Sequence, residues 1–338
     1  MIRLQCDYNY LGHEKVLEKI LAIQDEKLEG YGEDYYSNQA KVAIKKYLQA
    51  DSDIYFVIGG TSANQIALSS MLKPYEGVLA LNSGHIAIHE AGAIEATGHK
   101  VIVLSQDDKV YPDILLRHIR NYNADPTRTH IVKPKVLYLS LPGENGLTYT
   151  KAELKKIYQI CQEYDLYFYI DGARLAYALN QYLTLNDMAN LCDIFTIGGT
   201  KCGLPMGEAI VINNENLKSE FVYNIKQRGG LLAKGFILGV GFLALFEDGL
   251  YFQIGRQAVK KALYARKRLE EKGIRFYYDS KTNQQFPIVK KALFKKLSKH
   301  FLVEEWVDLG EEIVFRFVTN YNTNEKDLDK FVDFITKN

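Results

Sequence analysis

The chain has 338 residues, and its 42 lysines and arginines nearly balance its 41 aspartates and glutamates, for a formal net charge of +1. That balance gives no electrostatic reason to expect nucleic acid or an anionic membrane as a partner. Hydrophobic residues make up 47% of the sequence, as is ordinary for a globular protein, and a chain of this length buries a core shared between one large and one small domain.

The middle of the chain, up to about residue 212, is expected to alternate short apolar strands with longer helices. The strands are expected at 54–60, 77–81, 100–104, 135–141, 166–170, 193–197 and 208–213. The helices are expected after residue 60, over 87–98, 113–122 and 150–164, and in a short stretch from Arg174. Near-continuous apolar strands separated by helices are typical of a mostly parallel sheet in an α/β layer.

The C-terminal third has a different pattern. Two helical runs, over roughly 214–247 and 255–272, precede it. Strands are then expected at 274–278, 284–289, 301–307 and 312–318, with helices at 290–299 and 325–336. This mixture predicts a smaller α+β domain that begins near residue 249.

The stretch "GGTSANQ" (59–65) follows the first of these strands and precedes a helix. Backbone amides at a helix N-terminus, together with the hydroxyls of Thr61 and Ser62, suit a phosphate group. The alternative is an ordinary helix cap, because serine and threonine are favoured there in any case. The stretch has neither P-loop nor G-x-G-x-x-G spacing, which argues against an NTPase or a dinucleotide-binding protein.

Asp171 directly follows the strand at 166–170, and Arg174 comes three residues later in "YIDGARLAYAL". A carboxylate at the buried end of a strand must be paired or hydrogen-bonded. Either Asp171 pairs with Arg174 or caps a helix, or it faces a cationic ring nitrogen and leaves Arg174 free for a second anion.

Lys201 lies after a further strand in "DIFTIGGTKCGLPMG" (193–207), as the only charged residue between Asp193 and Glu208. Apolar surroundings disfavour the ammonium form and make the amine a usable nucleophile. A surface lysine with a packed stem is the alternative. Ligands of open α/β sheets bind beyond the carboxyl ends of the strands, so a phosphate cradle, a carboxylate and a lysine placed there together match the needs of pyridoxal phosphate.

Two regions contain histidines of interest. His85, in "LNSGHIAIHEAG", follows the strand at 77–81 and suits stacking on a planar ring. His89 lies four residues further on, but the pair does not form the H-E-x-x-H pattern, so we expect no metal. His130 precedes the strand at 135–141 and is either a site residue or a loop residue without a role.

Five stretches, taken in order, resemble the low-specificity L-threonine aldolase / β-eliminating lyase family: "GGTSANQIAL", "GHIAIHEAGAIEATGHKV", "YIDGARLAYAL", "IGGTKCGLPMGEAIVI" and "KQRGGLLAKGFILG". The resemblance extends from "YGED" (31–34) to "FRFVTNYNTNEKDLDKF" (315–331), and the ordered set is specific. It implies a pyridoxal-phosphate enzyme of fold type I, the aspartate-aminotransferase fold. The large α/β domain would then span 49–248, with a mostly parallel central sheet, and the small C-terminal α+β domain 249–338.

The resemblance implies roles for the principal site residues. Lys201 matches the Schiff-base lysine, and Asp171 matches the partner of the pyridine nitrogen. Arg174 and Arg316 match the arginines that hold the amino-acid carboxylate. His85 matches the histidine that stacks over the cofactor ring.

Further roles follow in the same way. Gly60, Thr61 and Ser62 match the phosphate loop, and Thr200 is expected to add a hydroxyl to it. Tyr31, in "YGED", matches a residue that lies near the active site at a subunit boundary.

Three stretches depart from the family pattern. The family's E-N-T-H-N corresponds to "SLPGENG" (140–146), which lacks the histidine, and the usual S-K-G-L-G corresponds to "TKCGL". The family's G-G-M-R-Q-S-G corresponds to "GGLLAKG", where Leu232 takes the place of the arginine, with Arg228 and Lys234 nearby as substitutes. These changes put the substrate in question more than the cofactor.

The implied reaction is retro-aldol cleavage of L-threonine or L-allo-threonine, β-hydroxy-α-amino acids, to glycine and an aldehyde by a carbon–carbon lyase. The base for the hydroxyl proton is His85, His130 (at the approximate position of a second histidine) or a water held by them, because the pKa of histidine lies near neutral. The motifs identify the electron sink and not the bond that breaks. β-Elimination or amino transfer on another small amino acid is the alternative, and a non-catalytic oligomeric binding protein is a second.

The cysteines and the N-terminus indicate a cytoplasmic protein. The four cysteines have no metal-type C-x₂-C spacing and are expected to be reduced thiols. The N-terminus "MIRLQCDYNY" has no apolar signal core, and no span approaches the roughly 20 apolar residues of a membrane helix, so no membrane partner is expected. The resemblance implies a homodimer or homotetramer with shared active sites, in which the segment 1–48 contributes to the small domain and to dimer contacts.

Overall fold

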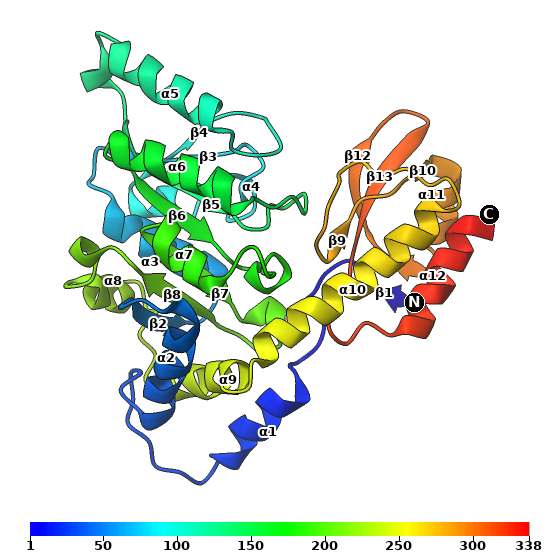
Figure 1. Cartoon of the computed structure of the whole chain (residues 1–338), viewed down its shortest axis with the longest axis horizontal. Coiled ribbons are helices and arrows are strands. Elements are labelled where there is room, and N and C mark those ends of the chain that lie inside the picture. The colour runs from blue at the N-terminus through cyan, green and yellow to red at the C-terminus, as the bar shows by residue number, and fades with distance from the viewer. Residues whose placement is uncertain (338) are drawn as a thin grey trace.

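The computed structural model describes residues 1–337, which form a large and a small domain connected by one long helix, α10 (Leu250–Glu270). In Figure 1 the large domain, built around its central sheet, lies at the start of α10, and the small domain surrounds the other end of that helix.

A seven-stranded sheet forms the middle of the large domain. Its strands lie in the order β2 (Asp53–Val57), β8 (Glu208–Ile212), β7 (Ile194–Gly198), β6 (Tyr167–Asp171), β5 (Lys133–Ser140), β3 (Glu76–Ala80) and β4 (Lys100–Val103). Within this sheet β8 is antiparallel to its neighbours β2 and β7, and the remaining neighbours pair in parallel. The mostly parallel sheet predicted from the sequence is confirmed.

Helices cover both faces of this sheet, which is why strands such as β7 and β8 are buried at every position. One face shares a core with buried side chains of α1 (Glu14–Ala22), α2 (Tyr35–Leu48), α5 (Pro112–Ala124), α6 (Lys151–Glu163), α7 (Leu185–Leu191) and α9 (Phe236–Phe246). The other face packs against α3 (Gly60–Met71), α4 (His85–Ile88) and α8 (Phe221–Gln227).

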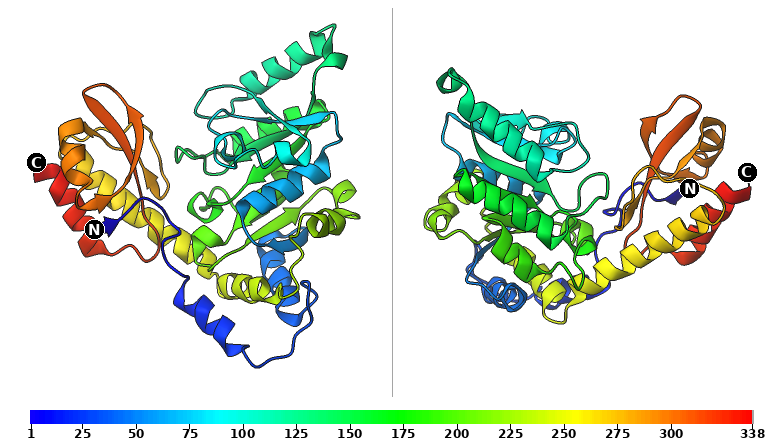
Figure 2. Two further views of the ribbon diagram at one scale, coloured as in Figure 1. Left: turned by 180° about the vertical axis from the view of Figure 1, so that it is seen from behind. Right: turned by 45° about the horizontal axis from the view of Figure 1, so that its top comes forward.

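The small domain is built on β13 (Glu312–Val318), which pairs antiparallel with β10 (Ile288–Lys290), β12 (Glu304–Asp308) and β9 (Gln284–Gln285). Its helices are α11 (Lys291–Leu297) and α12 (Glu325–Lys337). The N-terminal strand β1 (Ile2–Arg3) pairs in parallel with β11 (Phe301–Leu302), so the chain begins in the small domain, as both views of Figure 2 show.

The segment 1–48 is therefore divided between the domains. Its first residues join the small domain through β1 and through Leu4, which lies in the small-domain core. The helices α1 and α2 pack instead against α9 of the large domain. The expected boundary at residue 249 falls directly before α10, whose early side chains enter the large-domain core and whose late side chains enter the small-domain core.

Several expected elements differ from the structure, and the strands expected over 284–289 and 301–307 are each divided in two, into β9 and β10 and into β11 and β12. The helix expected over 87–98 is only α4 followed by the single turn η1 (Glu95–Thr97), because Ala91 and Gly92 have φ values of 50° and 73° that no helix continues through. The run over 214–247 is divided into η5 (Glu215–Leu217), α8 and α9.

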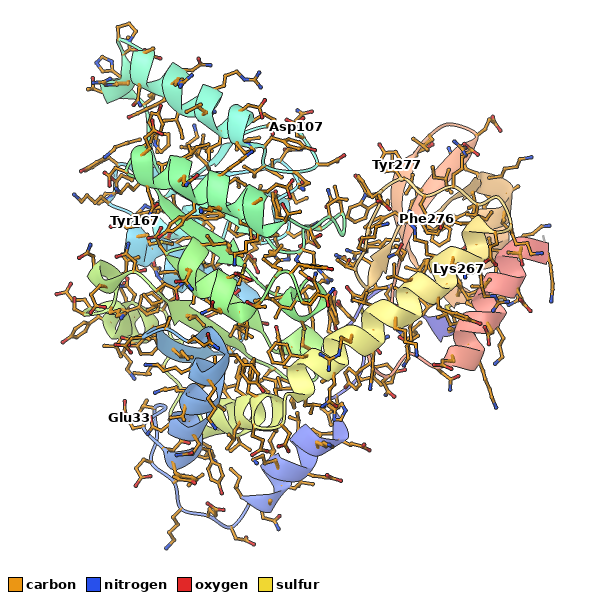
Figure 3. The ribbon with its side chains drawn as sticks, viewed as in Figure 1. Glu33, Asp107, Tyr167, Lys267, Phe276 and Tyr277 are labelled. Carbon is orange, nitrogen blue, oxygen red and sulfur yellow. The ribbon has the colours of Figure 1, made fainter. Side chains whose placement is uncertain are left out.

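The strand expected over 274–278 is reduced to one isolated bridge between Phe276 and Pro287. The ring of Phe276 lies 4.6 Å under the Arg266 guanidinium of α10 instead of facing a partner strand. Figure 3 labels Phe276 and its neighbour Tyr277 in the small domain.

Among residues 1–337, no single helix is long and apolar enough to span a membrane. The pair α9 and α10 passes on length and composition alone, but the two helices are bent by 68°. Every residue of α9 from Leu238 to Phe246 is buried.

Candidate active site

A cleft of about 790 Å³ is lined by residues of both domains. Of the site residues predicted from the sequence, it is lined by Gly60, Thr61, His85, Asp171, Arg174, Thr200, Lys201 and Arg316. Segments that follow the carboxyl ends of β2, β3, β6 and β7 form the large-domain wall, and β12 and β13 contribute the small-domain wall.

The sheet topology explains how Asp171 and Lys201 come to share this cleft. Asp171 is the last residue of β6, and the neighbouring parallel strand β7 ends at Gly198, three residues before Lys201. A Cβ on Gly198 would lie 2.1 Å from the carbonyl oxygen of Ala173, so only glycine permits the two strand ends to approach this closely.

The carboxylate of Asp171 is buried and accepts three hydrogen bonds. Its Oδ2 accepts hydrogen bonds from the Tyr138 hydroxyl at 2.7 Å and from Asn64 Nδ2 at 3.1 Å, and its Oδ1 accepts one from the Ala173 amide at 3.0 Å. These donors are neutral, so the negative charge of Asp171 is oriented without being cancelled. Burial and the Asp171 charge raise the pKa of Tyr138 far above its usual value, which keeps its hydroxyl a donor.

His85 is tied to the same network through Glu90. His85 Nδ1 lies 2.8 Å from Glu90 Oε1, which also accepts a hydrogen bond from Asn64 Nδ2 at 2.6 Å. Burial alone would lower the pKa of His85, but the Glu90 hydrogen bond and the charges of Glu144 and Asp171 raise it. The Nδ1 of the imidazole is held, and the His85 side chain lines the cleft.

The immediate sequence of Lys201 is uncharged, but its surroundings in space are not. The carboxylates of Asp7, Glu144 and Glu208 all lie close enough for the Lys201 charge to act on their pKa values. The predicted apolar environment of Lys201 is therefore wrong, because the fold brings carboxylates to it from remote parts of the chain.

Glu208 opens the buried strand β8 and lines the cleft. Burial raises its pKa to about 8, although the charge of Lys201 opposes this shift. Its Oε2 accepts one backbone hydrogen bond, from the Gly199 amide at 3.3 Å.

Arg174 is buried and already bound to protein carboxylates. Its Nε and Nη2 donate to Asp7 at 2.8 and 3.2 Å, and its Nη1 donates to Glu144 at 3.3 Å. Three of the five N–H donors of Arg174 are thus engaged, and its predicted role in holding the substrate carboxylate stays a prediction. Its position in the cleft is as expected, but its charge holds the N-terminal segment.

Arg316 reaches the cleft from β13 of the small domain. Its Nη1 donates to Gln284 at 2.9 Å, its Nη2 pairs with Glu304, and its guanidinium lies 5.1 Å over the Trp306 ring. Its buried Nε has no hydrogen-bond partner within residues 1–337. Arg316 thus lines the cleft with one guanidinium N–H still unpaired.

The turn after β2 is open toward the cleft. Gly59 caps α3 without any side-chain hydrogen bond, and a Cβ on Gly59 or Gly60 would have no heavy atom within 4 Å. The first amides of α3 thus face free space, as a phosphate cradle requires. Thr61 lines the cleft, whereas Ser62 lies on α3 outside the lining. Thr200 lines it too, and its Oγ1 accepts from the Gly207 amide at 3.0 Å.

His130 is not brought to the cleft. It lies exposed in the turn η2 (Arg128–His130), before the amino end of β5, whereas the cleft is at the carboxyl end of that strand. A strand of eight residues spans about 26 Å, so the prediction that His130 approaches the substrate is wrong for its own subunit.

Tyr31 also lies outside this cleft within one chain. It is 48% exposed and lines a separate pocket together with Leu232. Its place near the active site of a neighbouring subunit stays a prediction. The two residues suggested as replacements for the family's arginine also lie outside this cleft. Arg228 donates a hydrogen bond to Ser69 at 2.6 Å, and Lys234 is exposed.

Five acidic residues in or beside the cleft were not predicted to have a role: Asp7, Glu90, Glu144, Glu208 and Glu304. The sequence did give an indication for Glu208, since a charged residue at the start of an otherwise apolar strand must be paired or hydrogen-bonded if it is buried. It gave none for Asp7, because its partner is 167 residues away.

The residues present fit pyridoxal phosphate. The open amides at Gly59 and Gly60 match its phosphate, the oriented carboxylate of Asp171 matches its ring nitrogen, and the Lys201 amine matches its aldehyde. Among residues 1–337 no group of three or more histidine, cysteine or acidic side chains is arranged to hold a metal ion.

Comparisons with known proteins agree with this geometry. The sequence profile of the beta-eliminating lyase family matches residues 12–292. The low specificity L-threonine aldolase of Pseudomonas sp. (strain NCIMB 10558) is 31% identical over 230 residues, which is 66% of this chain and 65% of that enzyme.

Solved structures are similar over the whole chain. The threonine aldolase of Leishmania major is 38% identical, with a TM-score of 0.95 and coverage of 100% of this chain and 99% of that one. Cystalysin from Treponema denticola, which contains a pyridoxal 5'-phosphate cofactor, is 17% identical with a TM-score of 0.75, covers 100% of this chain and 90% of that one, and shares the fold.

Proposed function

The chain belongs to the beta-eliminating lyase family, and from that premise we propose that it is a pyridoxal-phosphate-dependent carbon–carbon lyase that cleaves L-threonine or L-allo-threonine to glycine and acetaldehyde. The observation that carries the proposal is that Lys201, Asp171 and Arg316 line one cleft. The first two come from adjacent strand ends of the large domain, and Arg316 comes from the small domain. The threonine aldolases named above share this chain's family or its whole fold.

Pyridoxal phosphate is the cofactor. When bound, it accepts the electron pair that a breaking bond leaves on the substrate Cα. Lys201 would hold it through its amine, the amides at Gly59 and Gly60 would bind its phosphate, and Asp171 would keep its ring nitrogen protonated. His85, held at Nδ1 by Glu90, would face its ring.

Arg316 binds the α-carboxylate of the amino acid. Its unpartnered Nε and its place across the cleft from Lys201 suit that role, and the contact fixes how the substrate lies against the cofactor. Arg174 lines the same cleft as a second arginine for that carboxylate, and its bonds to Asp7 also fix the N-terminal segment that lines the cleft with Cys6 and Tyr8.

Assembly and location belong to the same proposal. The enzyme works in the cytoplasm as a homodimer or homotetramer whose subunits share active sites, with Tyr31 at the boundary. Four buried free cysteines suit a reducing compartment, and the exposed apolar side chains of Ile58 and Met206 at the cleft suit burial by a second subunit. Light scattering on the purified chain tests the assembly.

The activity is tested with the full chain and added pyridoxal phosphate. We expect a visible absorption band of the bound cofactor, and glycine with acetaldehyde from L-threonine or L-allo-threonine. Pyruvate and ammonia from L-serine without aldol products would assign the chain to β-elimination instead. A chain that binds no pyridoxal phosphate would refute the proposal.

A further inference from the structure

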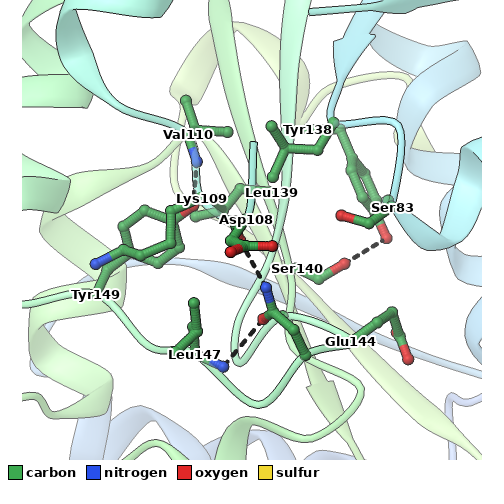
Figure 4. A pocket seen from close by; sticks show the side chains of 14 residues that line it. Ser83, Asp108, Lys109, Val110, Tyr138, Leu139, Ser140, Glu144, Leu147 and Tyr149 are labelled. Carbon is green, nitrogen blue, oxygen red and sulfur yellow. Dashed lines mark hydrogen bonds between the residues drawn. The ribbon is translucent and has the colours of Figure 1, made fainter. Parts of the chain in front are cut away.

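Glu144 lies in the loop after β5 with its side chain in the cleft. The side chain is 13% exposed, and the charges of Arg174, Lys201, His85 and Arg316 all act on it. Figure 4 shows Glu144 at the edge of a neighbouring small cavity, and none of the hydrogen bonds among the residues drawn there reaches its carboxylate. It is an acidic group that faces the reactive side of the cleft.

The backbone around Glu144 is fixed from both domains. Asn145 Nδ2 donates to the Asp108 carbonyl at 2.8 Å, and Asn145 Oδ1 accepts from the Leu147 amide at 3.1 Å. Gln284 of the small domain donates to the carbonyl of Gly143 at 3.2 Å. The loop is therefore a rigid support that presents the Glu144 side chain to the cleft.

Neutralising the arginines does not require Glu144. Arg174 already holds Asp7 through two hydrogen bonds, the shorter at 2.8 Å, whereas its contact with Glu144 measures 3.3 Å. The contact from Arg316 Nη1 to Glu144 is longer still, at 3.9 Å. A carboxylate this loosely paired is free to turn toward a ligand.

We propose that Glu144 is the base that accepts the β-hydroxyl proton of the substrate, the role for which the sequence offered His85 and His130. The inference rests on the proposed aldol cleavage. Glu144 is close enough to both Arg316 and Lys201 for their charges to act on it. A substrate with its carboxylate on Arg316 and its amino group at Lys201 therefore lies beside Glu144, which offers its β-hydroxyl a proton acceptor.

The proton and the electrons balance without any further reactant. The hydroxyl proton moves to Glu144, the O–H electron pair becomes the second bond of the aldehyde carbonyl, and the Cα–Cβ bond breaks. The electron pair of that bond stays on Cα, and one proton delivered to Cα gives glycine. Threonine is thus divided into two products with no change in total hydrogen.

Substrate binding itself makes Glu144 a better base. Burial alone would raise the pKa of Glu144, but the charges of Arg174, Lys201, His85 and Arg316 lower it in the free protein. A substrate carboxylate on Arg316 cancels part of that positive field, so the affinity of Glu144 for a proton rises when the substrate arrives.

The test compares two reactions of one site in Glu144→Gln, which keeps the shape and cannot take the proton. We expect threonine cleavage to fall by about 100-fold or more, the range of a lost general base. Exchange of the glycine α-proton in D₂O, which needs no hydroxyl base, is expected to persist. Glycine affinity, read from the cofactor spectrum, is expected to stay equal or to tighten, because a carboxylate beside Arg316 has been removed.

The outcomes separate this inference from the proposed function. Normal cleavage by Glu144→Gln, or loss of glycine exchange together with cleavage, would overturn the role of Glu144 while the bound-cofactor spectrum still upheld the enzyme class. A wild-type chain that neither binds the cofactor nor cleaves threonine would instead refute the proposed function.

The charge-matched control is Glu305→Gln, at an exposed position of β12. If Glu144→Gln does not fold, Glu144→Ala with added formate decides: restored cleavage supports a base, and no restoration contradicts it.

Discussion

Arg174 and Asp7 form a two-point ion pair inside the cleft although they lie 167 residues apart, with Nε to Oδ2 at 2.8 Å and Nη2 to Oδ1 at 3.2 Å. Asn283 donates to the same Asp7 oxygen at 2.9 Å. Burial opposes the charge on Asp7, but Arg174 and Lys201 outweigh it and lower its pKa. The pair thus ties the N-terminal segment to the sheet and to the small domain at one point.

Asp7→Asn is predicted to destabilise the fold, because it leaves the buried Arg174 charge with only its longer contact to Glu144. Breaking one side of a buried pair costs about 3 kcal/mol. Urea denaturation should show that loss in the free energy of unfolding, and the exposed Asp51→Asn, which breaks only a surface pair with Lys45, should lose far less. An unchanged midpoint for Asp7→Asn would mean that Arg174 is satisfied without Asp7.

Lys201→Ala is predicted to abolish cleavage and the absorption band of covalently held pyridoxal phosphate, because no other amine takes its place at the end of β7. Absorption spectra and an acetaldehyde assay check this result. Lys155→Ala, at an exposed position of α6, serves as the matched lysine control. Retention of the band in Lys201→Ala would place the cofactor lysine elsewhere.

Glu304 competes with the substrate for Arg316, because it is the small-domain carboxylate that pairs with Arg316 Nη2. Glu304→Gln is therefore predicted to lower KM severalfold, and Arg316→Lys to raise it by about tenfold or more through the loss of a planar donor pair. Steady-state kinetics on L-threonine measure both effects, with the cofactor band as a control for binding. If the KM of both variants equalled the KM of the wild-type chain, the substrate carboxylate would bind away from Arg316.

The strands, and the site residues that follow their carboxyl ends, could be predicted from the sequence, whereas the ion pairs around those residues could not. Asp171 and Lys201 could be placed because each follows an apolar run, and parallel neighbours end at one edge of the sheet. Arg174 was assigned to the cleft correctly, but its pairing with Asp7 could not be foreseen, because Asp7 enters through the N-terminal segment that begins with the strand paired with β11. A local sequence pattern cannot reveal a contact between residues that lie 167 positions apart.

His130 shows a second limit of local reasoning. A family resemblance places residues by their order along the chain, and it placed His130, in the loop before β5, at the approximate position of a second histidine near the substrate. The strand direction decides otherwise, since a residue before β5 lies at the opposite edge from one after it. The loop after β5 carries Glu144 in that place, and its acidity in the sequence gave no indication of the cations around it.

Glu208 is predicted to make stability depend on pH. Burial raises its pKa from an ordinary 4.5 to about 8, with Lys201 opposing and Asp171 adding to the shift. Between these values the folded chain holds a proton that the unfolded chain has lost, so the free energy of unfolding falls as pH rises from about 4.5 to about 8 and then levels. Glu208→Gln stays neutral throughout and should lack this part of the decline. Urea denaturation without added cofactor at pH 5, 7 and 9 compares the two chains, and parallel curves would show that Glu208 ionises normally in the fold.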